Sequence, residues 1–466
     1  MQRFFLATII LIYLVLATLY AIFTPNWQAP DEPAHFNYIR AIVETGNLPV
    51  LQRGDYDQDY LEKIKAAKFP ATMSIDAIRY ESYQPPLYYL AATPVYLATR
   101  GVGVDATVIA LRLFSVALGV VVLIVAYTIV REIFATRNDD LLALATVGAI
   151  ATIPQHIAVS ASISNDLAAE VVLALILLIA IKRINGAIRD SQFVILGGIA
   201  FGAALLTKTT AYVPGALVLM GAIFLAKQLR IMNALRDLRI TFFLFALAAL
   251  IAAPMFARNL LIYGITDPLG IARHDAVVIG QPTTAEMIAR FGLSKIVSDF
   301  FIVTFKSFWA QFGWMGVLVH ERIYLALLIL SGVAVVGIVK LEVGRWKLEI
   351  GSGSRAFTRL LVWINNPLKR RIQHPTSNIQ YLALTLCALL LIAAVADYIL
   401  YNFKFLQFQG RYLFPALIPI ALFAILGLRE LIPNLFRKII FALLYIALVA
   451  LDVICLFWFI VPQLKA

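Results

Sequence analysis

The chain has 466 residues, of which 61% are hydrophobic and only 14% are charged. Together with a mean hydropathy of +0.85, this composition excludes an ordinary soluble domain and a disordered chain, and indicates a polytopic membrane protein. The net charge of +12 comes mainly from Lys and Arg in short loops between apolar runs, with no basic patch interleaved with aromatic residues. We therefore interpret the charge as a topology signal and expect no nucleic-acid partner.

Long apolar runs recur from one end of the chain to the other. Because such runs match the hydrocarbon thickness of a bilayer, we predict an all-α fold with about eleven transmembrane helices. The first run resembles a signal peptide, but it is long enough to span a bilayer and lacks a clear cleavage site, which favours an uncleaved helix. The predicted segments are residues 4–23, 108–130, 141–161, 167–182, 193–206, 210–226, 240–257, 323–340, 379–400, 413–428 and 438–460.

The placement of Lys and Arg predicts an orientation. If Arg3 lies in the cytoplasm, every strongly basic connection falls on the same side of the membrane without a change in the number of helices. The positive-inside rule then places the N-terminus inside and the long loop 24–107 outside. The basic, Gly/Ser-rich connection 341–376 would be cytoplasmic, and we expect it to separate a module at 1–340 from a transmembrane helix group at 377–466.

The acidic pair Asp31-Glu32 stands between Pro30 and Pro33, where the first helix gives way to the outer loop. Apolar residues follow it at three-to-four spacing and Gly46 is placed to stop a helix, so we predict a helix that begins at the pair. A solvated, helix-capping pair is the simplest alternative. Against it, two carboxylates close to a membrane surface repel anionic headgroups unless they have a partner or a substrate. We therefore take the pair as the candidate chemical centre.

Further polar residues in this loop are candidates to assist the pair. His35 would lie on the first turn of the same helix, although a lone interfacial histidine is more often structural. Tyr83 and Gln84 precede Pro85-Pro86 and an apolar stretch to about residue 98, which we interpret as a helix in the outer interface. Gln84 suits a sugar hydroxyl or a phosphate oxygen, with ordinary loop hydrogen bonding as the alternative.

Later outer loops add one acid and three cations. Asp166 stands at the start of a helix, where capping alone would explain it, and Glu170 lies one turn deeper, at a depth where an acid is costly. Lys208, Arg258 and Arg411 lie in three outer connections, and each of them could simply snorkel. Together they form a set of cations on the same face as the acidic pair, suited to holding a lipid phosphate.

Several classes of site are missing from the sequence. It has no Walker loop, no dinucleotide-binding glycine motif after a strand, and no His or Cys residues at metal-ligand spacing. These absences disfavour an ATP-driven pump and a nucleotide-sugar enzyme, so a sugar donor would be lipid-linked. Cys387 and Cys455 lie in apolar runs, where a disulfide is not expected. No cofactor is predicted, and a divalent metal stays open because the acids are suitable ligands but too few.

A group of motifs resembles the GT-C superfamily of membrane glycosyltransferases, which includes the protein mannosyltransferases and the lipid A aminoarabinose transferases. The chain is most similar to a bacterial GT-C-like membrane family known only as a domain of unknown function, and the resemblance covers most of its length. The motifs that carry it are Pro30-Asp31-Glu32-Pro33-Ala34-His35-Phe36, Gln84-Pro85-Pro86-Leu87-Tyr88-Tyr89, Arg258-Asn259 with Tyr263-Gly264, Ser307-Phe308-Trp309 with Phe312-Gly313-Trp314, and Gln409-Gly410-Arg411-Tyr412.

The resemblance implies transfer of a sugar from a polyprenyl-phosphate donor to a lipid, glycan or protein acceptor. The reaction would belong to the cell envelope, at the outer, periplasmic face of a bacterial inner (cytoplasmic) membrane. Asp31 matches the catalytic or acceptor-activating acid of the first outer loop, and Glu32 accompanies it. Gln84 departs from the aminoarabinose transferases, which usually carry a cation there, so other residues would bind the phosphate. The implied substrate-binding residues are His35, Tyr83, Gln84, Asp166, Lys208, Arg258, Asn259, Arg411 and Tyr412.

Two other classes of function stay open. A transporter or flippase of a lipid-linked or amphiphilic solute would gather its polar residues near the bilayer midplane, often in two related halves. Here the polar residues gather near the outer ends of helices, although Asp397 and Asp452 lie in apolar runs. A non-catalytic assembly scaffold predicts that replacement of the acidic pair affects nothing beyond stability.

Overall fold

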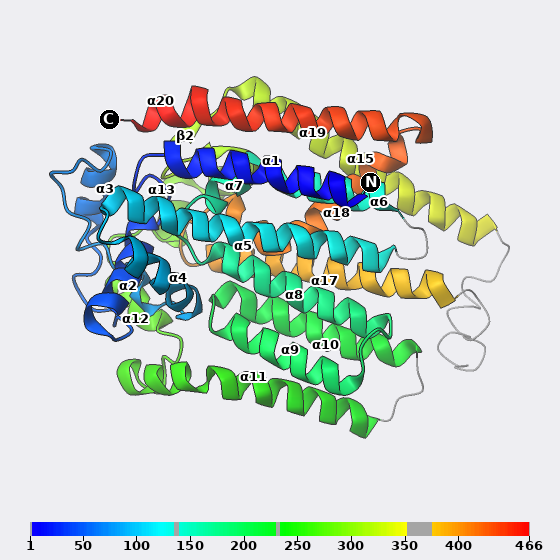
Figure 1. Ribbon diagram of the computed structural model, residues 1–466, viewed down its shortest axis with the longest axis horizontal. Helices are drawn as coiled ribbons and strands as arrows, with labels where there is room; N and C mark the ends of the chain where they lie inside the picture. Colours follow the sequence, from blue (N-terminus) through cyan, green and yellow to red (C-terminus); the bar gives the residue numbers. More distant parts are fainter. Residues whose placement is uncertain (1, 135–138, 230–233, 352–374, 466) are drawn as a thin grey trace.

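The computed structural model describes residues 2–134, 139–229, 234–351 and 375–465. In this part of the chain nearly all regular structure is helical, and the long helices run side by side along the longest axis of the molecule (Figure 1). Eight of the described helices are long and apolar enough to cross a membrane, or up to nine if one sharply bent pair counts as a single span. The protein is an integral membrane protein with the all-α fold that its composition predicts.

The bundle is built from the candidate spans, one bent pair and two further helices. The bent pair is α6 (Asp140–Ala151) and α7 (Pro154–Ser160), which meet at 67°. The break falls at Pro154, because proline disfavours a helical conformation in the residue before it. The helices of the candidate spans are α1 (Gln2–Phe23), α5 (Val104–Ile133), α10 (Tyr212–Leu229), α11 (Ala234–Tyr263), α15 (Glu321–Gly351), α17 (Pro375–Asn402), α18 (Leu417–Leu431) and α19 (Arg437–Ile454).

Every predicted transmembrane segment corresponds to a helix, but two of these helices are not among the eight candidate spans. They are α8 (Asp166–Ile184) and α9 (Asp190–Leu205), which pack against each other, although α9 also has exposed apolar side chains such as Ile195 and Ile199. α9 has only 16 residues. α8 carries acidic residues at its start and basic residues at its end, yet most of it is buried. Its charges are therefore satisfied by protein rather than excluded by lipid.

The first of the predicted outer loops packs as a cap on one end of the bundle, at the opposite end from the N-terminus (Figure 1). It contains α2 (Glu32–Thr45), α3 (Gln58–Ala66), the 3₁₀ turn η1 (Tyr80–Tyr83) and α4 (Leu87–Thr99). The predicted bounds of α2 are confirmed, because Asp31 occupies its N-cap and Gly46 ends it at φ 69°. A glycine adopts that left-handed conformation without strain.

Helix α4 differs from the predicted interfacial helix in what its tyrosines do. Tyr88 and Tyr89 are almost fully buried against α2 and α5 rather than placed at a lipid surface. The Tyr88 hydroxyl lies 2.9 Å from the hydroxyl of Ser115 on α5. The two rings thus fasten the cap to the bundle, which holds the acidic pair in a fixed position.

The second outer loop contributes α12 (Ile271–Val277), α13 (Thr284–Phe291) and α14 (Leu293–Trp309). The aromatic segment 305–314 is helical only as far as Trp309. It continues as an antiparallel hairpin of β1 (Gln311–Phe312) and β2 (Val317–Leu318). The remaining short elements are η3 (Thr209–Ala211), η5 (Gly410–Ala416), η6 (Asn434–Phe436), the π-helical turn η7 (Cys455–Ile460) and α20 (Val461–Leu464).

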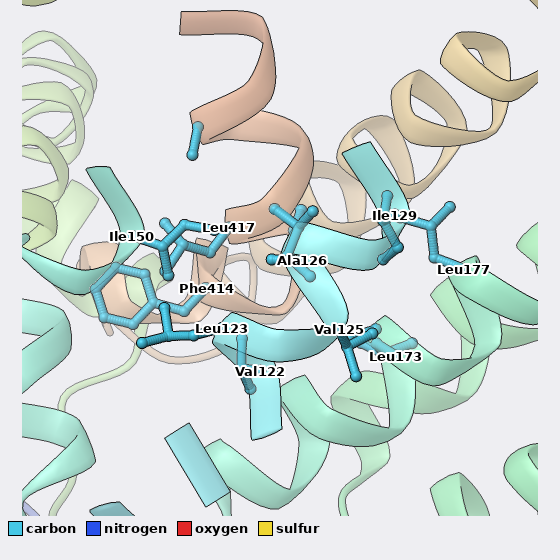
Figure 2. Close-up of a cluster of buried hydrophobic side chains, with 14 of the residues drawn as sticks. Val122, Leu123, Val125, Ala126, Ile129, Ile150, Leu173, Leu177, Phe414 and Leu417 are labelled. Atoms are coloured by element: carbon cyan, nitrogen blue, oxygen red, sulfur yellow. The ribbon is translucent and has the colours of Figure 1, made fainter. Parts of the chain in front are cut away.

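An apolar core beneath the cap joins α5, α6, α8 and the start of α18. Figure 2 shows side chains of α5, from Val122 to Ile129, beside Leu173 and Leu177 of α8 and Leu417 of α18. Phe414 of η5 belongs to the same cluster. Because η5 is anchored here, the core fixes the position of the turn that carries Arg411.

The predicted connection 341–376 lies largely outside the described residues, which omit 352–374. Its first part, to Gly351, continues helix α15. The division of the chain into 1–340 and 377–466 stays a prediction. In the structure, α17 packs against α8 and α10, and α18 packs against α6 and α15, so the C-terminal helices are integral to the bundle.

Candidate active site

Asp31 stands at the N-cap of α2 in a left-handed backbone conformation, with φ 66°. Asp tolerates this conformation better than most residues, but it still costs roughly 1–3 kcal/mol, so the surroundings must hold it. Its Oδ1 accepts a hydrogen bond from the Tyr80 hydroxyl at 2.8 Å, and its Oδ2 accepts one from Arg411 Nη2 at 2.5 Å. The carboxylate is thereby directed at η1 and η5.

Arg411 links Asp31 to a second acid. Its Nη1 lies 3.7 Å from Oδ2 of Asp166, the first residue of α8, and Asp166 is also ion-paired with Lys208. All four side chains are largely buried, with exposed fractions between 8% and 23%. We call Asp31, Arg411, Asp166 and Lys208 the charge network. In it, two of the three predicted cations lie beside two of the predicted acids.

The electrostatics of the charge network keep Asp31 ionised. Burial raises the pKa of the Asp31 carboxyl, but the Arg411 charge and the hydrogen bonds from Arg411 and Tyr80 outweigh burial and hold this pKa below its ordinary value. Arg411 retains one buried donor, Nε, that has no hydrogen-bond partner among the described residues. A buried donor without a partner costs free energy, so this guanidinium is suited to donating a hydrogen bond to an anionic group.

Glu32 faces a different part of the protein from its neighbour Asp31. It is fully buried, and its two carboxylate oxygens accept hydrogen bonds from Arg112, from Nη2 at 2.7 Å and from Nε at 2.8 Å. Backbone N–H groups of Trp27 and Ile163 also donate to its carboxylate, and Arg112 donates further to carbonyl groups where α1 ends. Glu32 therefore ties the cap to α1 and α5, and its oxygens are occupied by protein.

The three predicted residues of the first loop lie close to the charge network. His35 Nδ1 lies 2.8 Å from the Tyr89 hydroxyl, and burial lowers the pKa of His35 to about 4, so the ring is neutral at pH 7. Gln84 accepts from Asn165 Nδ2 at 3.3 Å and donates to the Tyr83 hydroxyl at 3.2 Å. Asn165 directly precedes Asp166, so these contacts join the proline-rich element to α8.

Arg258 and Asn259 donate hydrogen bonds to backbone carbonyl groups of the loops rather than to the charge network. Arg258 donates to the carbonyl groups of Leu48, at 3.1 Å, and Pro49, at 2.6 Å. Asn259 donates to the carbonyl of Pro268 at 3.0 Å. These bonds hold the two outer loops against α11, so both residues brace backbone rather than join the charge network.

The turn η5 approaches α14 closely at Gly410. The Gly410 N–H donates to Ser307 Oγ at 2.7 Å, and a Cβ added there would lie 2.3 Å from the backbone nitrogen of Phe308. Only glycine fits at this crossing. Arg411 is the next residue, so the close contact sets where its guanidinium reaches. Tyr412, which follows, packs against two tyrosine rings of α17.

A small cavity borders the charge network at Arg411. It also adjoins Pro30, and its volume of about 30 Å³ is enough for one or two water molecules. A sugar fits in this cavity only if side chains move. A much larger space of about 810 Å³ opens at the outer ends of α1 and α5, where Arg40, Lys68 and Lys465 are among its lining residues.

The acids of the site do not make a metal-ligand set. Across the ranges that the structure describes, no group of three or more His, Cys, Asp or Glu side chains is placed to hold a metal ion. Instead the guanidinium of Arg411 contacts both Asp31 and Asp166. A divalent cation would have to displace it, so the residues present do not fit a resident metal.

Two residues that matter here escape the sequence predictions. Arg112 is a single cation inside the apolar run of α5, and the cost of a charge in such a run signals a buried partner. Glu81 lies in η1 beside Tyr80, and its Oε2 is buried without a hydrogen-bond partner among the described residues. No pattern in the sequence distinguishes Glu81 from the other acids of the loop.

No protein-family model and no curated protein matches the chain. Among solved structures, the oligosaccharyltransferase of Archaeoglobus fulgidus in complex with Zn and sulfate matches with a TM-score of 0.53 and 15% identity, over 96% of this chain and 52% of that one. The same enzyme tethered to an acceptor peptide matches with a TM-score of 0.51 and 14% identity, over 99% and 55%. ArnT from Cupriavidus metallidurans, bound to undecaprenyl phosphate, gives 0.47 and 14%, over 99% and 73%.

The ArnT score is too low to carry an argument. The two oligosaccharyltransferase structures establish the architecture, and the chain spans about half of that protein's length. At such low identity, a structural match establishes the fold and nothing about the reaction. The protein therefore has the fold of the part of this oligosaccharyltransferase that it matches.

Proposed function

We propose that the protein is a membrane glycosyltransferase that moves a sugar from a polyprenyl-phosphate donor to an acceptor at the outer face of the membrane. The observation that carries the proposal is the charge network. Two acids and two cations from four separate segments meet in a largely buried position, at the end of the bundle that the outer loop caps. Such preorganised charge, shielded from water, is what stabilisation of a departing phosphate requires.

In this scheme the acceptor hydroxyl or amine binds beside Asp31 and attacks the anomeric carbon of the sugar. Polyprenyl phosphate leaves with the electron pair of the broken bond. Arg411 and Lys208 stabilise its charge. Both cations are paired with Asp31 and Asp166 in this structure, so an arriving phosphate must compete for them. The Nε of Arg411 has no hydrogen-bond partner among the described residues, so the phosphate can accept a hydrogen bond from it without displacing an acid.

The scheme assigns the two acids of the predicted pair different roles. Asp31 contacts the charge network, so it is the member that we place next to the substrate. Glu32 is held by Arg112 and two backbone N–H groups, and we give it the structural role of fixing Asp31 in its left-handed conformation. The orientation, with the N-terminus in the cytoplasm and the site in the periplasm of a bacterial inner membrane, rests on the positive-inside pattern.

Transport of an amphiphilic solute is the alternative function, and Asp452 is the observation that favours it. Asp452 on α19 is fully buried within a candidate span, and neither carboxylate oxygen has a hydrogen-bond partner among the described residues. Acids in such positions often belong to ion or proton pathways. Asp452→Asn separates the two functions, because a transporter loses activity and a glycosyltransferase of the proposed kind does not.

The test measures release of polyprenyl phosphate by purified protein in liposomes, from a panel of polyprenyl-phosphate-linked hexoses and hexosamines labelled in the lipid. Lipid, glycan and peptide acceptors are supplied together, because the transfer needs an acceptor. We expect release from at least one donor. Asp31→Asn should reduce the rate by at least ~10²-fold, the scale that a misplaced reacting group can cost. Asp59→Asn, which alters an exposed acid of the same loop, is the matched control and should keep the parental rate.

Two results would contradict the proposal. One is a complete lack of release from every donor in the panel by the parental protein. The other is a parental rate for Asp31→Asn, which is also what a non-catalytic scaffold predicts.

A further inference from the structure

Glu81 is a partly buried acid that the transfer scheme leaves unused. It belongs to the turn η1, next to Tyr80, whose hydroxyl binds Asp31. Its Oε2 is buried and has no hydrogen-bond partner among the described residues. Nearly all buried polar atoms in proteins are paired, so an orphan carboxylate oxygen beside the candidate site calls for an explanation. A catalytic role is one of the few that fit.

Charged and titratable groups face Glu81 from each element packed against it. Burial raises the pKa of the Glu81 carboxyl to about 7, and the negative charge of Asp31 adds to the rise. The charges of His274 on α12 and of Lys208 oppose the rise, as does a hydrogen bond from Gln84. The carboxyl therefore binds and releases a proton near neutral pH. The negative charge of Glu81 also interacts with four tyrosines, which are Tyr80, Tyr83, Tyr89 and Tyr401.

Asp31 is poorly suited to take up a proton itself. Both its oxygens are engaged, Oδ1 by Tyr80 and Oδ2 by Arg411. Despite the effect of burial, these contacts hold its pKa below the ordinary value. A general base works best when its pKa lies near the working pH. Asp31 is thus suited to orienting an acceptor, and the deprotonation falls to another group.

We propose that Glu81 is the general base that accepts the proton of the acceptor, while Asp31 orients the acceptor. The inference rests on the proposed glycosyl transfer and names its proton acceptor. The acceptor oxygen or nitrogen forms a bond to the anomeric carbon as the bond from that carbon to the phosphate oxygen breaks. The electron pair leaves with polyprenyl phosphate, and the proton moves from the acceptor to Oε2 of Glu81. After product release, Glu81 returns the proton to water.

The experiment follows release of polyprenyl phosphate from the labelled donor panel between about pH 6 and about pH 8, the interval that brackets the Glu81 pKa of about 7. The parental rate should rise through this interval as Glu81 ionises. Glu81→Gln, which keeps the shape but not the base, should be slower by ~10²–10⁴-fold and lose the rise. Glu81→Asp should be slow but retain a rise with pH. Glu62→Gln, an exposed acid of the same loop, should match the parental protein.

Binding of labelled polyprenyl phosphate separates chemistry from structure. Glu81→Gln that binds it like the parental protein but does not transfer supports the assignment. A parental rate and pH profile in Glu81→Gln overturns the assignment and leaves the proposed function standing. Loss of binding in Glu81→Gln, with no pH-dependent rate in Glu81→Asp, assigns Glu81 a structural role instead. Absence of release by the parental protein overturns the proposed function and this inference with it.

Discussion

Arg411 donates to Asp31 across 2.5 Å although the two residues are 380 positions apart in the chain. Asp31 comes from the cap that follows α1, and Arg411 comes from the turn that precedes α18. The candidate site therefore needs both ends of the sequence, and the C-terminal helices complete it rather than merely flank it.

Gly410→Ala tests whether the position of Arg411 matters for transfer. A Cβ at Gly410 would lie 2.3 Å from the backbone nitrogen of Phe308, so η5 must move away from α14. A displacement of about 1 Å in a catalytic group can cost ~10²-fold in rate, and we expect a loss of that order. Gly332→Ala, where a Cβ meets nothing within 4 Å, is the control. Equal transfer rates for the two variants would show that η5 does not position the site.

The Glu32–Arg112 pair predicts a loss of stability rather than of chemistry. Both side chains are at most 1% exposed. Removing one partner of a buried ion pair typically costs about 3–5 kcal/mol, so Arg112→Met should lower the thermal unfolding temperature strongly. Lys295→Met, which breaks an exposed pair on α14, should change stability by less than about 1 kcal/mol.

A double-mutant cycle completes this test. Glu32→Gln combined with Arg112→Met should cost less than the sum of the two single changes, because each single change leaves the other group buried without its partner. Additive losses would mean that the two side chains do not depend on each other.

His35 predicts a specific dependence of stability on pH. Burial lowers its pKa to about 4 in the folded protein, whereas an unfolded chain titrates near the ordinary value of 6.5. The unfolded state therefore binds more protons between these values, and folding stability falls as the pH drops from about 6.5 to about 4. His35→Gln should show a shallower fall in unfolding temperature over this interval, while His320→Gln, an exposed control, should follow the parental curve. Coinciding curves for all three proteins would contradict a buried neutral His35.

The position of Arg411 between two acids predicts transfer without an added metal. Its guanidinium contacts both Asp31 and Asp166, which are the acids that a divalent ion would need. We therefore expect the release assay to give the same rate with and without a chelator. Loss of activity in the chelator that Mg²⁺ or Mn²⁺ restores would contradict this expectation.

Hydropathy predicts the helices of this protein well because lipid imposes a simple requirement on sequence. A run of apolar residues long enough to cross a bilayer almost has to be a helix. The same reasoning counts α8 and α9 as spans, although neither is among the described helices that are long and apolar enough to cross a membrane. In α8, hydropathy does not show that most residues are covered by protein. Glu170 of α8 illustrates the point, since it is buried at 3.0 Å from His156 and never meets lipid.

The candidate site was only partly predictable. Asp31, Asp166, Lys208 and Arg411 carry charge at the outer ends of helices, so the topology alone places them on one face. Asp31 and Glu32 have different roles because the left-handed backbone conformation of Asp31 turns the two side chains to different parts of the protein. That conformation cannot be predicted from the two residue types. Glu81 differs from the exposed acids of the loop in its partial burial, which it shares with the more deeply buried Asp55, and burial follows from how the cap packs on the bundle.

The measurement that tests the account most directly is a structure of the protein with polyprenyl phosphate bound. The account predicts that the phosphate lies against Arg411 and Lys208, on the side that Asp31 faces, with at least one of the two ion pairs to the acids exchanged for a contact to phosphate. A phosphate bound away from both cations, with the Asp31–Arg411 and Asp166–Lys208 pairs intact, would contradict it.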